Sequence, residues 1–167
     1  IERIFVAGAG LMGHGIAQVH AAVGKQVAVY EPELARAEAG LARIAGNLDR
    51  AVAKGKLAPD DREGILSRLT GSSDLAMAGD ADLVIEAVFE DVEVKTRLWT
   101  ALDKIAPAGA IFASNTSSIA IDRLAAAVGE VRRARFIGMH FFSPVPVMPL
   151  VELIRGSATT DVTETAI

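Results

Sequence analysis

The chain of 167 residues lacks cysteine, has only three histidines and few aromatic side chains, and contains no apolar run as long as a membrane span. Without cysteine it forms neither disulfides nor cysteine-ligated metal centres, and a first segment without signal-peptide regions favours a reducing cytoplasm. The few aromatic residues and the net charge of −4 argue against a nucleic acid partner. We therefore expect a cytoplasmic protein that binds neither membranes nor nucleic acid.

The composition that remains is globular, with 51% apolar and 23% charged residues. This balance is too hydrophobic for a disordered chain, and the length suits a single domain. Composition is even along the chain and no internal repeat occurs, so the sequence predicts no domain boundary within these residues.

The first thirty residues predict a strand, a glycine-rich turn, a helix and a second strand. Residues 4–7 and 26–30 are short apolar or β-branched runs, and residues 13–23 carry apolar side chains at helical spacing. A strand–helix–strand unit of this kind has a right-handed crossover and parallel strands. We expect a doubly wound, mostly parallel α/β fold of the Rossmann type.

The remaining elements continue this alternation of helix and strand. A helical hairpin is expected over residues 33–69, with a break near residues 55–59 and a new helix N-terminus at Asp60 and Asp61. Further strands are predicted at residues 81–87, 110–114, 135–139 and 150–154, and helices at residues 92–105 and 119–128.

Asp161 and Glu164 have the spacing of a capping box that opens a helix, less than two turns before the sequence stops. A helix this short is marginal without packing, and the sequence also lacks an initiating Met. We therefore expect residues 1–167 to be one piece of a longer protein, cut near the start of a connecting helix.

The glycine-rich turn predicts a nucleotide site. Gly8 allows the tight turn, Gly10 lets a pyrophosphate approach the backbone, and Gly13 lets helix and strand pack closely. Unpaired N–H groups at the helix N-terminus then bind the phosphates. The G-x-G-x-x-G pattern consists of Gly8, Ala9, Gly10, Leu11, Met12 and Gly13.

Glu31 follows the second strand, where a carboxylate accepts hydrogen bonds from both ribose hydroxyls of NAD and repels the extra phosphate of NADP. The sequence therefore favours NAD as the cofactor, while Arg36 on the following helix leaves NADP open. His14 and His20 are six residues apart, which does not place them on one helix face as a metal pair. We predict no metal site.

His140 and Glu152 form a candidate acid–base pair. Histidine exchanges protons near neutrality, since its unperturbed pKa is about 6.5, and it works best when a carboxylate orients its ring. Glu152 lies between Val151 and Leu153 in a predicted strand, so its side chain either meets a polar partner or faces solvent on an edge strand. The residues alone leave both possibilities open.

Four segments together closely resemble the NAD-binding domain of the 3-hydroxyacyl-CoA dehydrogenase family, which includes 3-hydroxybutyryl-CoA dehydrogenases. They are FVAGAGLMGHGIA, IEAVFEDVEVK, IFASNTSSI and HFFSPVPVMPLVELIRG, and the resemblance covers essentially the whole chain. It implies reversible, NAD-dependent oxidation of a (3S)-3-hydroxyacyl-CoA to a 3-oxoacyl-CoA, in fatty-acid β-oxidation or butanoate metabolism.

The resemblance also implies roles for single residues. His140 would be the catalytic base, Glu152 its partner, and Ser117 the residue that hydrogen-bonds the substrate oxygen. CoA contacts are implied for Asn47 and Lys54 in the helical hairpin. Further cofactor contacts, near the ribose and nicotinamide, are implied for Glu90, Lys95, Asn115 and Ser117.

The hairpin aligns loosely with the family, so Lys56 is an alternative to Lys54, and either lysine is otherwise a solvated helix residue. Ser143 stands where the family usually has Asn. The family's C-terminal helical domain, which completes the acyl pocket and makes the homodimer, is absent from this chain. The resemblance therefore implies a homodimeric full-length protein and a chain that is poorly active by itself.

Two other functions share features of this sequence. The gulonate dehydrogenase and lambda-crystallin group shares the glycine-rich turn and the SNTSS-like segment, but its histidine motif reads approximately H-P-x-N-P-P, which HFFSP fits less well. A dinucleotide-binding module without catalysis would be indicated by a missing His, Ser or Glu, and His140, Ser117 and Glu152 are all present.

Overall fold

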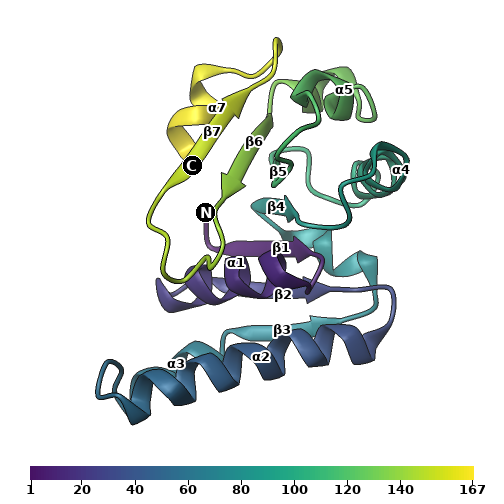
Figure 1. Cartoon of the computed structure of the whole chain (residues 1–167). Coiled ribbons are helices and arrows are strands. Elements are labelled where there is room, and N and C mark those ends of the chain that lie inside the picture. The colour runs from purple at the N-terminus through teal and green to yellow at the C-terminus, as the bar shows by residue number, and fades with distance from the viewer.

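A seven-stranded sheet forms the centre of the computed structural model, which describes residues 1–167 (Figure 1). Its strands are β1 (Arg3–Ala7), β2 (Gln26–Tyr30), β3 (Leu69–Ser72), β4 (Leu83–Glu86), β5 (Ile111–Ser114), β6 (Phe136–Phe141) and β7 (Val151–Arg155). The strand order is β3-β2-β1-β4-β5-β6-β7, and every neighbouring pair is parallel except β6 and β7. This order confirms the doubly wound, mostly parallel fold that the sequence predicts.

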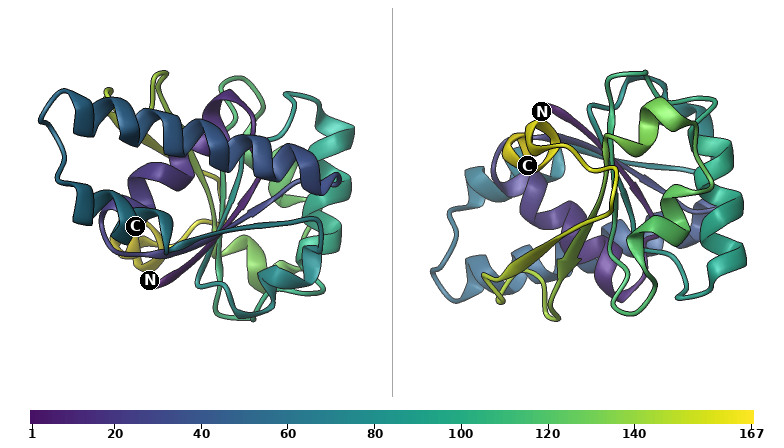
Figure 2. Two further views of the ribbon diagram at one scale, coloured as in Figure 1. Left: turned by 90° about the horizontal axis from the view of Figure 1, so that it is seen from below. Right: turned by 90° about the horizontal axis from the view of Figure 1, so that it is seen from above.

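Helices cover both faces of this sheet. They are α1 (Leu11–Ala22), α2 (Leu34–Ala53), α3 (Pro59–Leu66), α4 (Val92–Leu102), α5 (Ile121–Ala125), α6 (Glu130–Arg133) and α7 (Asp161–Ala166), with a 3-10 helix η1 (Leu75–Asp80). Figure 2 shows α1 and α2 on one side of the strands and α4 and α5 on the other. None of the helices combines the length and apolarity needed to cross a membrane.

Alternation along the central strands builds one apolar core on each face of the sheet. In β4, Leu83 and Ile85 belong to the core beneath α1, whereas Val84 belongs to the core beneath α4. Glu86 has the same parity as Val84 and is fully buried, so its carboxylate points toward α4. A buried carboxylate needs polar partners, and α4 supplies one.

The helical hairpin after β2 is confirmed, but its end differs from the prediction. The break near residues 55–59 separates α2 from α3, which begins at Pro59 with two aspartates in its first turn. The sequence predicts helix as far as Leu69, yet Leu69 begins β3. This strand has four residues, contains Gly71 and lies at the edge of the sheet, so it carries little periodic signal.

Two other helix predictions need correction. The helix predicted over residues 119–128 is shorter, because only α5 is regular there. The N-cap of α7 is Thr160, whose hydroxyl accepts a backbone hydrogen bond, rather than Asp161. Asp161 and Glu164 instead pair with Arg155 of β7, at 2.7 and 3.0 Å.

Arg132 ties α6 to the connection between α4 and β5. Its side chain is 6% exposed and lies 3.1 Å from Asp103 Oδ1. It also donates to the carbonyl oxygens of Pro107 and Ala110, both at 2.7 Å, and its guanidinium carbon lies 4.4 Å from the ring centre of Phe112. No side chain other than arginine offers as many donors in one plane.

Arg132→Met should therefore lower the free energy of unfolding by about 3–5 kcal/mol, the range for breaking a buried charge pair. Arg133→Met, the matched change at the exposed neighbouring position, should alter it by less than about 0.5 kcal/mol. Urea unfolding followed by circular dichroism measures both. Equal losses in the two variants would contradict the role given to Arg132.

Candidate functional site

The glycine-rich turn joins β1 to α1 at the carboxyl edge of the sheet. Gly8 has a φ of +104°, and a Cβ built at Gly13 would lie 1.8 Å from Gly8 O, so turn and helix touch backbone to backbone. A Cβ at Gly10 would meet nothing within 4 Å. The open space above Gly10 and the N-terminus of α1 therefore fit the diphosphate of a dinucleotide.

Glu31 lies directly after β2, beside the turn. Its Oε1 accepts a hydrogen bond from the backbone N–H of Ala9 at 2.6 Å, which fixes the carboxylate next to the predicted phosphate site. Arg36, the residue that could bind the extra phosphate of NADP, forms an ion pair with Glu33 at 3.0 Å and not with Glu31. The arrangement fits the adenosine ribose of NAD.

His140 and Glu152 are direct cross-strand partners in the antiparallel pair β6 and β7. Paired residues present their side chains on the same face, and here His140 Nδ1 lies 2.9 Å from Glu152 Oε2. A carboxylate only accepts hydrogen bonds, so Nδ1 carries the proton and Nε2 is the basic nitrogen. Glu152 thus meets a polar partner although it lies on an edge strand with 52% of its side chain exposed.

Ser117 lies in the same groove as this pair. The groove has a volume of about 300 Å³ and is lined by residues 116–121 together with His140, Glu152 and Ile154. The fold therefore brings together the three residues predicted to be catalytic, from the loop after β5 and from two different strands. Their catalytic roles stay predictions.

Asn115 fixes the strand that carries the histidine. Its Oδ1 accepts a hydrogen bond from the backbone N–H of Phe141 at 2.9 Å, beyond the last backbone partners of β5 and β6, Ser114 and Gly138. His140 directly precedes Phe141, so this bond restrains the histidine backbone. The contact predicted between Asn115 and the nicotinamide end of the cofactor stays a prediction.

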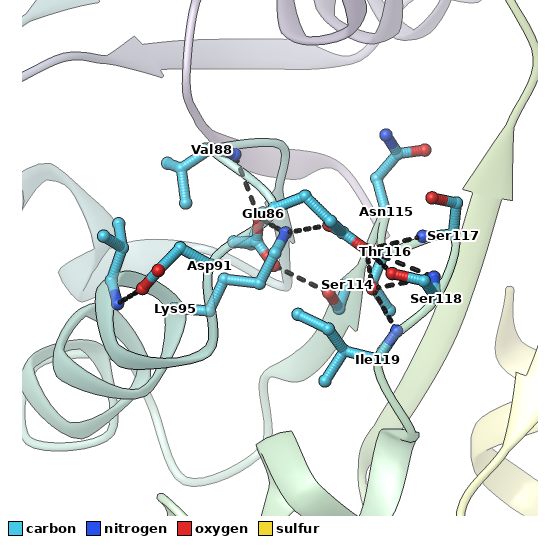
Figure 3. A network of polar contacts seen from close by, with 12 residues as sticks. Glu86, Val88, Asp91, Lys95, Ser114, Asn115, Thr116, Ser117, Ser118 and Ile119 are labelled. Atoms are coloured by element: carbon cyan, nitrogen blue, oxygen red, sulfur yellow. Dashed lines mark hydrogen bonds and ion pairs between the residues drawn. The ribbon is translucent and has the colours of Figure 1, made fainter.

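Buried charges lie at the adjoining ends of β4, β5 and α4 (Figure 3). Glu86 accepts hydrogen bonds from Lys95 Nζ at 2.5 Å, from Ser114 Oγ at 2.6 Å and from the N–H of Val88 at 2.9 Å. Lys95 Nζ also lies 3.1 Å from Glu90 Oε2. The Lys95 side chain, for which a cofactor contact is predicted, is 1% exposed.

Glu90 links these charges to the loop that carries Ser117. Its Oε1 accepts hydrogen bonds from the Thr116 hydroxyl, from the N–H of Ser117 at 3.0 Å and from the N–H of Ser118 at 3.2 Å. Burial acts to raise the pKa of Glu90, but the Thr116 bond and the charge of Lys95 outweigh it and lower that pKa to about 2. The carboxylate is therefore charged throughout the physiological range.

A second groove, which we call the basic groove, lies between the helical hairpin and the connection from β6 to β7. Asn47 accepts a hydrogen bond from Arg50 at 2.5 Å and donates one to Gln18 at 3.0 Å, which leaves one donor and one acceptor position of its amide. No carboxylate lines the groove. Its lining residues are Gln18, Asn47, Arg50, Ala51, Lys54, Lys56, Pro144, Pro146 and Val147.

His14 and His20 both lie on α1, with Nδ1 at 2.6 Å from Gly10 O and at 2.8 Å from Ile16 O, respectively. Burial lowers the pKa of His20, in spite of the bond to Ile16. Its ring also packs on the edge of Phe141, with ring centres 6.0 Å apart. No cluster of three or more His, Cys, Asp or Glu side chains suited to a metal ion occurs in the chain.

Sequence reasoning missed Glu86, Thr116 and Arg50. For Glu86 a signal exists, because a carboxylate ends the otherwise apolar run LVIE, just as Glu152 interrupts PLVELI. Thr116 and Arg50 carry no comparable signal, since a threonine in a loop and an arginine on a helix are ordinary.

The low pKa of Glu90 predicts pH-dependent stability. Its pKa is about 2 in the folded chain against an ordinary 4.5, so the charged form stabilises the fold above about pH 4.5 and the contribution is lost as the pH falls toward 2. Glu90→Gln should flatten the pH dependence of the unfolding free energy between about pH 5 and 3. Urea titrations at a series of pH values measure the unfolding free energy, with Glu93→Gln at an exposed site as control. If the unfolding free energy of Glu90→Gln depended on pH as in wild type, the lowered pKa of Glu90 would be contradicted.

Glu31→Ala should weaken NAD binding more than NADP binding, because only NAD offers both hydroxyls to the carboxylate. Isothermal titration of the chain with each nucleotide tests this, and Glu38→Ala, an exposed change on α2, is the matched control. Equal losses for the two nucleotides would argue that Glu31 does not contact the ribose.

The chain is similar to known proteins over almost its whole length. A family model described as 3-hydroxyacyl-CoA dehydrogenase, NAD binding domain, matches residues 3–167. A 3-hydroxybutyryl-CoA dehydrogenase of Mycobacterium tuberculosis is 47% identical over 162 residues, which are 96% of this chain and 56% of that protein. The mitochondrial hydroxyacyl-coenzyme A dehydrogenase of Sus scrofa is 42% identical over 173 residues, covering 98% of this chain and 53% of that protein.

Among solved structures, the (S)-3-hydroxybutyryl-CoA dehydrogenase PaaH1 from Ralstonia eutropha matches with a TM-score of 0.96 and 44% identity, over 99% of this chain and 58% of that one. The chain therefore spans little more than half the length of these relatives. The family model covers all but the first two residues of the chain. The open space at Gly10 is where a bound NAD would approach the backbone. The chain belongs to the 3-hydroxyacyl-CoA dehydrogenase family, in which it forms the NAD-binding domain.

Proposed function

We propose that the whole protein catalyses the reversible oxidation of a (3S)-3-hydroxyacyl-CoA to the 3-oxoacyl-CoA. The observation that carries this proposal is the contact of 2.9 Å between His140 and Glu152, on a groove shared with Ser117. NAD, when bound at the glycine-rich turn, supplies the acceptor for the hydride that leaves C3. The names of the relatives, 3-hydroxybutyryl-CoA and hydroxyacyl-coenzyme A dehydrogenase, support the substrate class.

In this mechanism His140 takes the hydroxyl proton. The lone pair on Nε2 accepts it while the C3–O bond becomes a carbonyl, and the same nitrogen returns it in the reverse direction. Glu152 keeps the proton on Nδ1, orients the ring and stabilises the imidazolium that forms. The Ser117 hydroxyl donates a hydrogen bond to the substrate oxygen and holds it beside His140.

The basic groove is proposed to bind the phosphates of CoA. Arg50, Lys54 and Lys56 line it without an opposing carboxylate, and arginine and lysine are the side chains that pair with phosphate. Lys54 remains the first candidate for this contact and Lys56 the alternative. Pro144 and Val147, a few residues after His140, form part of the same groove, so the phosphate site and the histidine share one short segment.

A second, helical domain is proposed to complete the acyl pocket and to form a homodimer. The chain spans little more than half the length of its relatives. Several large apolar side chains after His140 are also exposed, and exposed apolar patches often mark a surface that another part of the protein covers. Since a chain without cysteine suits a reducing compartment, we also propose a cytoplasmic location. The exposed large apolar residues between His140 and the end of β7 are Val147, Met148, Leu150, Leu153 and Ile154.

In the full-length protein, His140→Gln should reduce turnover of acetoacetyl-CoA with NADH by about two to four orders of magnitude, because the proton loses its acceptor. Glu152→Gln should cause similar damage, whereas Glu130→Gln, an exposed change on α6, should leave turnover unaltered. NAD affinity, measured by titration, should stay close to wild type in all three. Wild-type turnover in His140→Gln would exclude His140 as the base, and wild-type turnover in Glu152→Gln would exclude Glu152 as its required partner.

Residues 1–167 alone should bind NAD but turn over acetoacetyl-CoA at least about a hundredfold more slowly than the full-length protein. The reacting carbon is then not held by the second half of the acyl pocket. Parallel nucleotide titrations and turnover assays on the two proteins give the comparison. Equal turnover would show that the second domain is dispensable.

A further inference from the structure

Apolar side chains line part of the groove that holds the proposed catalytic residues. This groove, which we call the histidine groove, is the one of about 300 Å³ lined by residues 116–121, His140, Glu152 and Ile154. The proposed mechanism uses His140, Glu152 and Ser117. It gives no role to the apolar lining, which consists of Ile119, Ala120, Ile121 and Ile154.

Strand register places Ile154 on the same face of the sheet as the histidine. Glu152 and Ile154 are two residues apart in β7, and they pair with His140 and Gly138 of β6. Residues two apart in a strand point to the same face and lie about 7 Å apart along it. Ile154 is therefore one step inward from the histidine, away from the carboxyl edge of the sheet.

Gly138 leaves the sheet surface beside Ile154 without a side chain of its own. A Cβ at Gly138 would lie 2.8 Å from Ile121 Cδ1, closer than side chains approach one another, and 3.0 Å from Ile154 Cβ. Ile121 and Ile154 thus meet over the glycine and form one apolar surface. Ile121 is 5% exposed and Ile154 is 38% exposed, so Ile154 is the one of the two that a ligand in the groove can touch.

The four substituents of the reacting carbon indicate where the acyl tail lies. In the proposed function, C3 of the alcohol carries a hydroxyl held by His140 and Ser117, and a hydrogen that leaves toward the nicotinamide at the carboxyl edge. Its third substituent, C2, leads through the thioester to CoA in the basic groove, beside Pro144 and Val147. Because this segment follows the carboxyl end of β6, the inward direction, toward Ile154, is left for the fourth substituent, C4.

We propose that Ile154 contacts the acyl carbons from C4 onward, and that the size of its side chain sets the acyl chain length that the enzyme prefers. The proposal rests on the proposed function, because it places the tail relative to the hydroxyl that His140 deprotonates. An alkyl chain lying on the exposed isoleucine removes apolar surface of both groups from water, which drives the binding of such chains.

Substitutions at position 154 change the space for the tail in both directions. Ile154→Ala shortens the side chain to a methyl group, and Ile154→Phe enlarges it with a residue that is common in strands. Leu153→Ala and Leu153→Phe are the matched controls. Leu153 is also 38% exposed, but it pairs with Met139 of the core beneath α1 and so faces the opposite side of the sheet.

The value of kcat/KM is measured for the full-length protein with acetoacetyl-CoA and with 3-oxooctanoyl-CoA, each with NADH. The ratio of the second value to the first should rise at least about tenfold in Ile154→Ala, because the longer tail fills space that the short substrate leaves empty. It should fall at least about tenfold in Ile154→Phe, since the ring occupies the space of the carbons beyond C4. Both Leu153 variants should keep the wild-type ratio.

A wild-type ratio in the Ile154 variants would overturn the proposal. It would show that the second domain covers Ile154, because lost packing between domains lowers kcat/KM for both substrates alike. An equal change of the ratio in the Leu153 variants would also refute it, since the tail would then not depend on the face that carries His140. The two Ile154 variants predict opposite shifts, so either one that folds is sufficient.

The same assays separate this proposal from the proposed function. Without wild-type turnover of either substrate, the proposed function fails and the role of Ile154 fails with it. Wild-type turnover together with an unchanged ratio in the Ile154 variants refutes the role of Ile154 alone.

Discussion

Parallel pairing of the central strands is the constraint on which the rest of the site depends. Parallel strands all end at the same edge of the sheet, so the residues that follow them meet there although they are far apart in sequence. Gly8 follows β1, Glu31 follows β2, Glu86 ends β4 and Ser114 ends β5. A nucleotide across this edge is therefore within reach of four separate segments.

The antiparallel strand β7 is the exception that completes the site. A parallel strand beside β6 would need a long crossover, whereas nine residues suffice to turn the chain back and pair Glu152 with His140. Because β7 is an edge strand, Glu152 keeps half of its side chain in contact with solvent. The carboxylate can thus stabilise a charged imidazole without the desolvation that a central strand would impose.

Secondary structure that depends on neighbouring residues could be predicted from the sequence. Contacts between distant segments could be predicted only in part. The glycine-rich turn and its neighbouring strands follow from short-range rules, and the structure has them as expected. The pairing of His140 with Glu152 depends on register between two strands, so the sequence left it open. The sequence predicts helix at Leu69 because a four-residue edge strand gives no periodicity of its own.

Glu86 illustrates a different limit. Its position at the end of an apolar run indicates a buried carboxylate, but the partner, Lys95, lies on a helix whose pattern is that of any amphipathic helix. The packing of α4 on the sheet determines that the Lys95 side chain is buried against Glu86. The sequence therefore predicts that the Glu86 carboxylate needs a buried polar partner, but only the structure identifies that partner as Lys95.

The three glycines of the turn are required for different physical reasons. A side chain at position 13 would collide with Gly8 O, and position 8 needs a backbone conformation that other residues rarely adopt, so the fold itself requires both glycines. Gly10 faces open space and is required only by the nucleotide. A homologous chain that keeps glycine at 8 and 13 but carries a bulky residue at 10 would thus preserve the architecture after losing its cofactor, and this single position distinguishes a degenerate relative from a working one.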